Sequence, residues 1–210
     1  MSVMSFGPLL KKAKTLKRKG TPEPKVGDAW IYTTVKRRSY LFAAFSVGKW
    51  TQQTCFDMMQ KLARVVRQPS WQSTLELFTD GNDDYAYVLP RCFPLGLIDY
   101  GQLIKVKEHG RLVRKERMVI YGVAALDDVE TTAVENFNGI LRERIGRLVR
   151  RTKCFAKLEM RLVCAVGLFQ FYWNFINEFK RGLSPAKMEG LTDHIWTWHE
   201  LFHYQIGILN

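Results

Sequence analysis

The sequence predicts an α/β protein in which helices cover a mixed β-sheet. Three observations indicate this class. Segments rich in aromatic and β-branched residues come early in the chain, segments with helical periodicity come late, and a helical segment links consecutive strands. This order favours a sheet packed against layers of helices. The chain has 210 residues, 47% of them hydrophobic, which allows the core of one large domain or two small ones.

The beginning of the chain combines a charged arm with two strands. The first 26 residues are interpreted as a basic arm with a remnant of a first strand, because they are crowded with lysine and interrupted by glycine and proline. Residues 30–35 and 40–47 have the composition of strands, and residues 37–39 have that of a turn. We therefore expect the sheet to begin with these two neighbouring strands.

Helices and strands alternate in the middle of the chain. A helix is predicted to begin after Thr51, whose side chain can cap it, and to end before Pro69. The next strand is predicted over residues 74–79, followed by a short helix over 84–89 and a strand over 102–107. A basic stretch continues from this last strand without a strand pattern of its own.

Two long helices are predicted in the second half, over residues 131–151 and 155–179. The second contains the most apolar stretch of the chain, residues 162–176, which is shorter than the about 20 residues that a membrane span needs. We interpret it as a buried helix. Residues 27–182 are accordingly expected to form one domain, and residues 183–210 a tail.

The charge balance points to an acidic partner. Lysine and arginine number 32 against 20 aspartate and glutamate, which gives a net charge of +12. Such an excess is typical of proteins that bind nucleic acid or, less often, an acidic membrane surface; the alternative is a basic but otherwise ordinary globular protein. No two of the four cysteines have the C-x-x-C spacing of a zinc ribbon, and the start of the chain has no apolar run of signal-peptide length. A reducing cytoplasm is the expected compartment.

Asp80 is the first candidate site residue. It follows an apolar strand in the segment LFTDGNDDY. A carboxylate at the end of a buried strand is well placed to hold a hard metal ion at the edge of a sheet. The alternative is that Asp80 only shapes the turn, because Asp-Gly is a frequent turn pair.

Glu135 is the second candidate, in the segment TTAVENFNGILRER. Glu135, Asn138 and Arg142 have the spacing of one helix face, separate from the apolar stripe, and would suit a metal ligand beside a phosphate backbone. The alternatives are a capping box, formed by Thr132 and Glu135, and a solvated basic face. Further arginines extend the positive charge: Arg144, Arg147, Arg150 and Arg151.

Several of these segments together resemble the insertion-sequence-one family of bacterial and archaeal transposases. They are TDG at 79–81, VENFNGILR at 134–142, YWNF at 172–175 and SPAKMEGLTDHIWTWHEL at 184–201, with GDAW at 27–30. The resemblance covers most of the chain from GDAW onward. Its most specific parts are the E-x-x-N-x-x-x-R spacing and the GLTDHIW segment.

The resemblance implies an RNase H-like fold with a DDE site, in which three carboxylates hold two Mg²⁺ or Mn²⁺ ions. Such a site cuts and joins DNA strands during transposition by in-line displacement. Asp80 matches the second acid and Glu135 the third, while Asn138 and Arg142 match the positions after the glutamate. The implied partners are the DNA of the insertion-sequence ends and of the target, and further copies of the chain on that DNA. The implied location is the nucleoid, with no membrane contact.

The first acid of the family pattern has no equivalent at its expected place. The aspartate and glutamate of that pattern would fall on Met1 and Ser2. Asp28, which opens a strand in GDAW, is the candidate replacement. The zinc-binding and helix-turn-helix portion of the family is also absent, so we expect a chain truncated at its start. The alternative to an active transposase is a catalytically inactive, truncated DNA-binding relic.

His199-Glu200-Leu201-Phe202-His203 matches the zinc motif H-E-x-x-H. On a helix this spacing puts two imidazoles on one face, with a glutamate as base. A zinc peptidase also needs a third protein ligand further along the chain, and the residues after His203 contain no histidine or glutamate. A zinc peptidase is therefore the least favoured alternative, and we expect these histidines to pack among aromatic neighbours.

Overall fold

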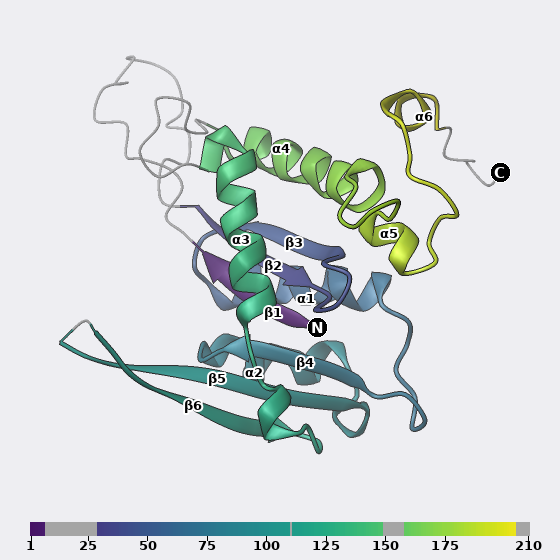
Figure 1. Ribbon diagram of the computed structural model, residues 1–210. Coiled ribbons are helices and arrows are strands. Elements are labelled where there is room, and N and C mark those ends of the chain that lie inside the picture. Colours follow the sequence, from purple (N-terminus) through teal and green to yellow (C-terminus); the bar gives the residue numbers. More distant parts are fainter. Residues whose placement is uncertain (7–28, 110, 149–157, 205–210) are drawn as a thin grey trace, which may run out of the picture.

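The computed structural model describes residues 1–6, 29–109, 111–148 and 158–204 (Figure 1). These residues form a mixed, open sheet of six strands in the order β3-β2-β1-β4-β5-β6, with helices on both faces. The α/β class predicted from the sequence is therefore confirmed. No helix within the described ranges has both the length and the apolar character needed to cross a membrane.

The central strands β1, β4 and β5 are parallel to one another, whereas β2, β3 and β6 each run antiparallel to a neighbour. The strands are β1 (Ser2–Phe6), β2 (Trp30–Val35), β3 (Phe42–Gly48), β4 (Leu75–Asp80), β5 (Ile98–Glu108) and β6 (Arg111–Tyr121). The remnant of a first strand expected in the basic arm is thus a full strand, and it lies in the middle of the sheet.

The first four helices lie in the order expected from the sequence, and two short helices that were not predicted lie in the segment expected to be a tail. The helices are α1 (Gln52–Val65), α2 (Asp83–Cys92), α3 (Thr132–Arg144), α4 (Glu159–Phe171), α5 (Pro185–Met188) and α6 (Trp198–His203), with a π-helical turn η4 (Tyr172–Ile176) after α4. Thr51 caps α1 as predicted, because its Oγ1 accepts a hydrogen bond from the backbone N–H of Thr54 at 3.3 Å.

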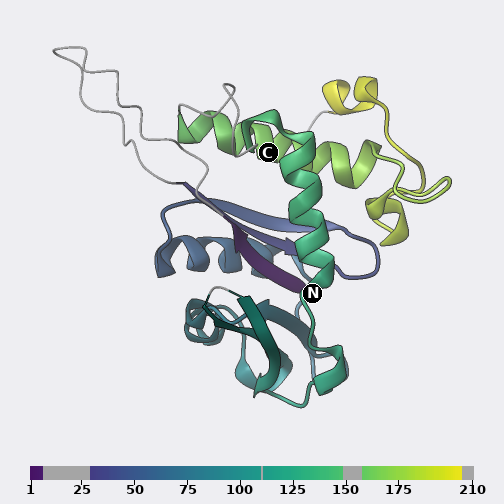
Figure 2. The same ribbon diagram turned by 60° about the vertical axis from the view of Figure 1, so that its left-hand side comes forward.

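The sheet separates two apolar cores. Helices α1 and α2 cover one face, and α3, α4 and η4 cover the other, so that α1 and α4 lie on opposite sides of β2 and β3 (Figure 2). At the centre of the second core the ring of Phe137 on α3 lies 4.9 Å from Phe42 on β3 and 5.3 Å from Trp173 on η4, measured between ring centroids. Burial of these large rings fixes α3 across the strands.

The π-helical turn η4 supplies the hydrogen bonds that the start of β3 lacks. The side-chain amide of Asn174 accepts from the backbone N–H of Phe42 at 2.8 Å and donates to its carbonyl at 2.9 Å. Gln170 on α4 donates to the carbonyls of Phe42 and Ala43 at 2.8 and 3.1 Å. Amide side chains thus replace a neighbouring strand and protect this sheet edge from pairing with another chain.

Several boundaries differ from those predicted. The helix expected over 131–151 ends at Arg144, and the helix expected over 155–179 is described from Glu159 and changes to π geometry at Tyr172. Strand β6 was not predicted at all, because its mostly exposed residues lack the apolar alternation that indicates a strand. Pairing with β5 along its whole length stabilises β6 instead.

Candidate functional site

Asp80 is the last residue of β4, at the point where this central strand leaves the sheet. It pairs with Leu103 on the parallel strand β5. The next residue, Gly81, lies so close to β5 that a Cβ there would be 3.2 Å from Cγ1 of Ile104, which is tighter than ordinary van der Waals contact. The chain therefore turns sharply at Gly81, and Asp80 is held against β5.

The environment of Asp80 differs from that of a turn residue. Its Oδ1 atom is buried and accepts no hydrogen bond from the described residues. Capping of α2 is done by Asn82, whose Oδ1 accepts from the backbone N–H of Asp84 at 3.1 Å. Burial raises the pKa of Asp80 to about 6; the backbone N–H of Asn82 and the charge of Lys105 oppose this rise, and the charge of Glu135 adds to it.

A buried hydrogen-bond network holds Asp80 from the opposite face of the sheet. Thr79 Oγ1 donates to the carbonyl of Asp80 at 2.8 Å and lies 2.9 Å from the hydroxyl of Tyr100. Gln102 Nε2 donates both to that hydroxyl, at 2.8 Å, and to the carbonyl of Asn82, at 3.2 Å. The network ties both ends of the turn to β5. Sequence reasoning placed Thr79 and Gln102 in strands, assigned Tyr100 to no element and gave none of the three a role.

Glu135 lies in the first turn of α3 and is not part of a capping box. The cap residue is Thr131 rather than Thr132, and its side chain makes no capping hydrogen bond. Glu135 Oε1 instead accepts hydrogen bonds from Lys105 Nζ and Thr131 Oγ1, both at 2.5 Å. Burial alone would raise the pKa of Glu135, but these two hydrogen bonds outweigh it and leave the pKa below its ordinary value.

The two predicted acids therefore lie on the same face of the sheet. Lys105 follows two residues after Leu103, the partner of Asp80, so it points to the same side of β5. Its ammonium binds Glu135, and the charges of Lys105 and Glu135 both act on Asp80. Asp80 at the end of β4 and Glu135 on α3 come together although they are far apart in the sequence. Sequence reasoning placed Lys105 in a predicted strand and a basic stretch, and gave it no role beside the acids.

The described residues contain no third carboxylate at this place. No group of three histidine, cysteine, aspartate or glutamate side chains that could hold a metal ion occurs among them. Met1 and Ser2, the family positions of the first acid, lie at the start of β1, where the buried Ser2 Oγ donates to the carbonyl of Glu130 at 3.4 Å. Asp28, the candidate replacement, falls outside the described residues.

The polar residues that follow Glu135 on α3 differ in how far they are buried. Asn138 is only 2% exposed, and its Oδ1 accepts a hydrogen bond from Thr33 Oγ1 on β2 at 2.9 Å. A side chain buried between α3 and β2 offers no surface to a phosphate, which differs from the predicted contact with DNA. Arg142 is half-buried, whereas Arg144 and Arg147 are exposed. The predicted DNA-contacting residues Arg150 and Arg151 lie outside the described part of the chain.

The hairpin of β5 and β6 brings further cations to the acid pair. Lys115 pairs with Lys105 and Arg117 pairs with Leu103, so both lie on the same face as Lys105. Arg117 Nε donates to the carbonyl of Val129 at 3.1 Å, and the charge of Lys115 contributes to the lowered pKa of Glu135. The hairpin runs past the end of β4 (Figure 1), so these side chains extend the positive charge outward from the two acids.

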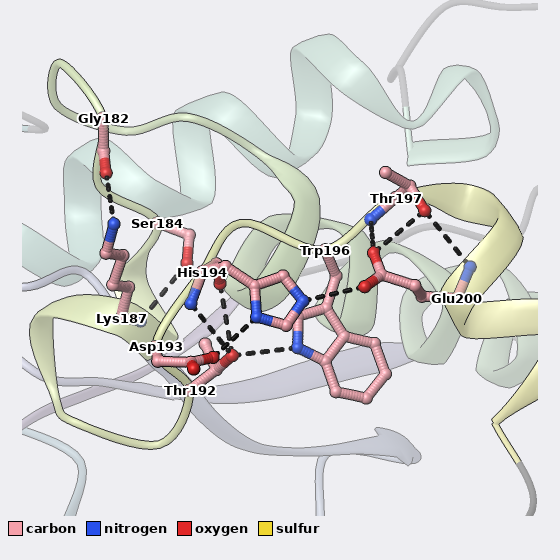
Figure 3. A network of polar contacts seen from close by, with 9 residues as sticks. All are labelled: Gly182, Ser184, Lys187, Thr192, Asp193, His194, Trp196, Thr197 and Glu200. Carbon is pink, nitrogen blue, oxygen red and sulfur yellow. Dashed lines mark hydrogen bonds and ion pairs between the residues drawn. The ribbon is translucent and has the colours of Figure 1, made fainter.

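The H-E-x-x-H motif forms a helix start and no zinc site in the described structure. In α6, Glu200 Oε2 accepts from the backbone N–H of Thr197 at 2.6 Å, and Thr197 Oγ1 accepts from the backbone N–H of Glu200 at 3.2 Å, which is a capping box. Glu200 Oε1 also lies 2.8 Å from Nε2 of His194 (Figure 3). The rings of His199 and His203 stack at 4.0 Å on this exposed helix. The glutamate is thus occupied as a cap, and the zinc-peptidase alternative has no support.

Comparison with known proteins does not assign the chain to a family. No family model, no curated protein and no solved structure matches it. The functional interpretation therefore depends on the site geometry described above and on the sequence resemblance.

Proposed function

We propose that this protein is an RNase H-like transposase domain of the insertion-sequence-one type, which cuts and joins DNA strands by metal-dependent phosphoryl transfer. One observation carries the proposal. The two acids selected from the sequence, Asp80 and Glu135, lie on one face of the sheet and are linked by Lys105, which binds Glu135 and lies two residues beyond the β5 partner of Asp80. Acids that only shaped a turn and capped a helix would have no reason to converge.

The architecture supports the same proposal. An RNase H-like domain is a mixed sheet flanked by helices, and the described chain is a mixed sheet with helices on both faces. Asp80 ends a central parallel strand, and Glu135 lies on the helix that crosses the adjoining strands. Carboxyl ends of parallel strands are the usual place for sites in α/β sheets.

The two carboxylates fit one divalent ion. Mg²⁺ is commonly bound by one or two carboxylates together with waters and substrate phosphates. Asp80 has a buried oxygen without a hydrogen-bond donor among the described residues, and the side chain of Glu135 is 36% exposed and so accessible from solvent. A bound ion would supply activation of the attacking oxygen and charge stabilisation of the leaving oxygen. The described residues provide no ligand set for the second ion that the resemblance implies.

The residues of the chain itself then have distinct tasks. The network of Thr79, Tyr100 and Gln102 keeps Asp80 in one position, because it ties the backbone on both sides of the turn to β5. Lys115, whose charge reaches Glu135, and the exposed arginines at the far end of α3 and in the turn after it neutralise DNA phosphates. Their contribution to affinity is electrostatic and carries no sequence preference.

A second candidate function is favoured by the incomplete set of acids. A relic that still binds DNA but has lost catalysis would keep the fold and the basic face, and β1 as described carries no acidic residue. The two candidates predict the same DNA binding and differ only in strand cleavage.

The test is cleavage of DNA that carries the terminal repeats of the element, with Mn²⁺ as cofactor. A transposase cleaves this DNA, and Asp80→Asn and Glu135→Gln each abolish the product without loss of DNA binding. Asp83→Asn is the matched control, because Asp83 is an exposed acid in the first turn of α2, close to Asp80 in the sequence. Cleavage that survives both site substitutions would refute the proposed site, whereas binding without cleavage in the unaltered protein would identify the relic.

A further inference from the structure

The proposed metal site already contains a positive charge. Lys105 Nζ lies 2.5 Å from Glu135 Oε1, the same oxygen that accepts the hydrogen bond of Thr131. The charge of Lys105 also acts on Asp80 and opposes the rise in its pKa. A single ammonium therefore binds one of the two carboxylates that would hold a divalent ion, and its charge acts on the other.

The register of the sheet explains why a lysine is found at this place. Pairing of β4 with β5 stops at Asp80 and Leu103, while β5 continues to Glu108. Lys105 is thus the first residue on the α3 side of β5 that lies beyond the end of β4. With β4 no longer beside it, its side chain reaches Glu135 on α3 and remains 27% exposed.

We propose that Lys105 is an internal counter-ion that competes with the divalent cation for Asp80 and Glu135, so that the metal binds only when the lysine is displaced. This inference rests on the proposed function. Two carboxylates that share a half-buried site repel each other, and the ammonium relieves that repulsion in the metal-free protein. A divalent ion bound to the same oxygens would repel the ammonium in turn.

Displacement of the lysine is feasible because its side chain is flexible. A lysine ammonium is a compact charge on a four-carbon stem and keeps its charge in several rotamers. Lys115 is the cross-strand partner of Lys105 on β6, so a Lys105 ammonium released from Glu135 would leave two positive charges side by side. A substrate phosphate at that position would replace the carboxylate as the partner of the lysine, which would link binding of the polyanion to binding of the metal.

The experiment measures Mn²⁺ binding without DNA, by electron paramagnetic resonance of the free ion. Lys105→Met removes the charge and keeps the length of the side chain, whereas Lys105→Arg keeps the charge. The control is Arg114→Gln, because Arg114 lies on the opposite face of the same hairpin, where its Nε is 2.8 Å from Glu116 Oε1. The control removes the same charge from the protein but not from the site.

We expect Lys105→Met to bind Mn²⁺ about fivefold more tightly than the unaltered protein, a ratio equivalent to about 1 kcal/mol for a partly exposed ion pair. The arginine variant and the Arg114→Gln control should bind as the unaltered protein does. Thermal unfolding provides a second measurement. Lys105→Met should unfold at a lower temperature than the unaltered protein in EDTA and should gain more stability from added Mn²⁺.

The outcomes separate this inference from the proposed function. If Lys105→Met binds Mn²⁺ no more tightly than the unaltered protein, and Asp80→Asn still abolishes that binding, the competition is refuted and the metal site stands. If Lys105→Met binds no Mn²⁺, the metal site itself is refuted and the competition with it. The same conclusion follows if Lys105→Met still binds Mn²⁺ after Asp80→Asn or Glu135→Gln is added.

Discussion

Replacement of Asp80 by asparagine should stabilise the metal-free protein at neutral and alkaline pH. The substitution keeps the shape of the side chain and removes a charge that the site disfavours in the absence of metal. Burial, with a smaller contribution from the charge of Glu135, raises the pKa of this carboxyl from 3.8 to about 6. A group whose pKa is raised in the folded state contributes stability below the pKa of the unfolded state, and this contribution is lost as the pH rises through the folded value.

The size of the effect follows from the two pKa values. A shift of about two units corresponds to about 3 kcal/mol, since each unit is worth 1.36 kcal/mol. At pH 8 the carboxylate is charged in both the folded and the unfolded state, and its ionisation lowers the free energy of unfolding by this amount. The cost declines between about pH 6 and pH 4 and vanishes below that window, because the carboxyl is then protonated in both the folded and the unfolded chain.

The assay is urea unfolding of Asp80→Asn and of the unaltered protein in EDTA, at pH 8 and again at the lowest pH at which both fold. We expect the variant to be more stable by about 3 kcal/mol at pH 8 and equally stable at low pH. Asp83→Asn, with an exposed carboxylate, should show neither effect. A variant that is less stable than the unaltered protein at pH 8 would mean that the site stabilises the ionised Asp80 carboxylate without metal. The argument that Asp80 is a metal ligand with an unfavourable charge in the metal-free protein would then fail.

Three further predictions concern the core, the sheet edge and DNA. Phe137→Ala should lower the free energy of unfolding by about 3 to 5 kcal/mol in urea, because it leaves a cavity between two aromatic neighbours; an effect below 1 kcal/mol would contradict the described packing. Asn174→Ala should cost about 2 to 3 kcal/mol in the same assay, since it leaves both backbone groups of Phe42 without their partner, while Asn177→Ala serves as a nearby control. Affinity for duplex DNA should fall steeply with salt, and Lys115→Met should reduce the slope of the logarithmic plot by about 1; a flat dependence for the unaltered protein would argue against phosphate contacts.

The amino-acid sequence alone determined the class of the fold and selected the two acids that the proposal uses. Strand and helix order follow from local composition and periodicity, which depend on neighbours in the chain. Thr51 as a helix cap and Asp80 at the end of a strand could be predicted for the same reason. A metal ion and a polyanion were also predicted from the sequence, because two acids among basic segments suggest both, and these stay predictions.

Only the tertiary structure decided what each of these residues contacts. Glu135 has the spacing of a capping box, yet it binds Lys105, whose position depends on the register between β4 and β5. Asn138 has the spacing of an exposed helix face, yet α3 presses it against β2. Contacts between distant segments arise from packing and register, and a local pattern carries no information about either.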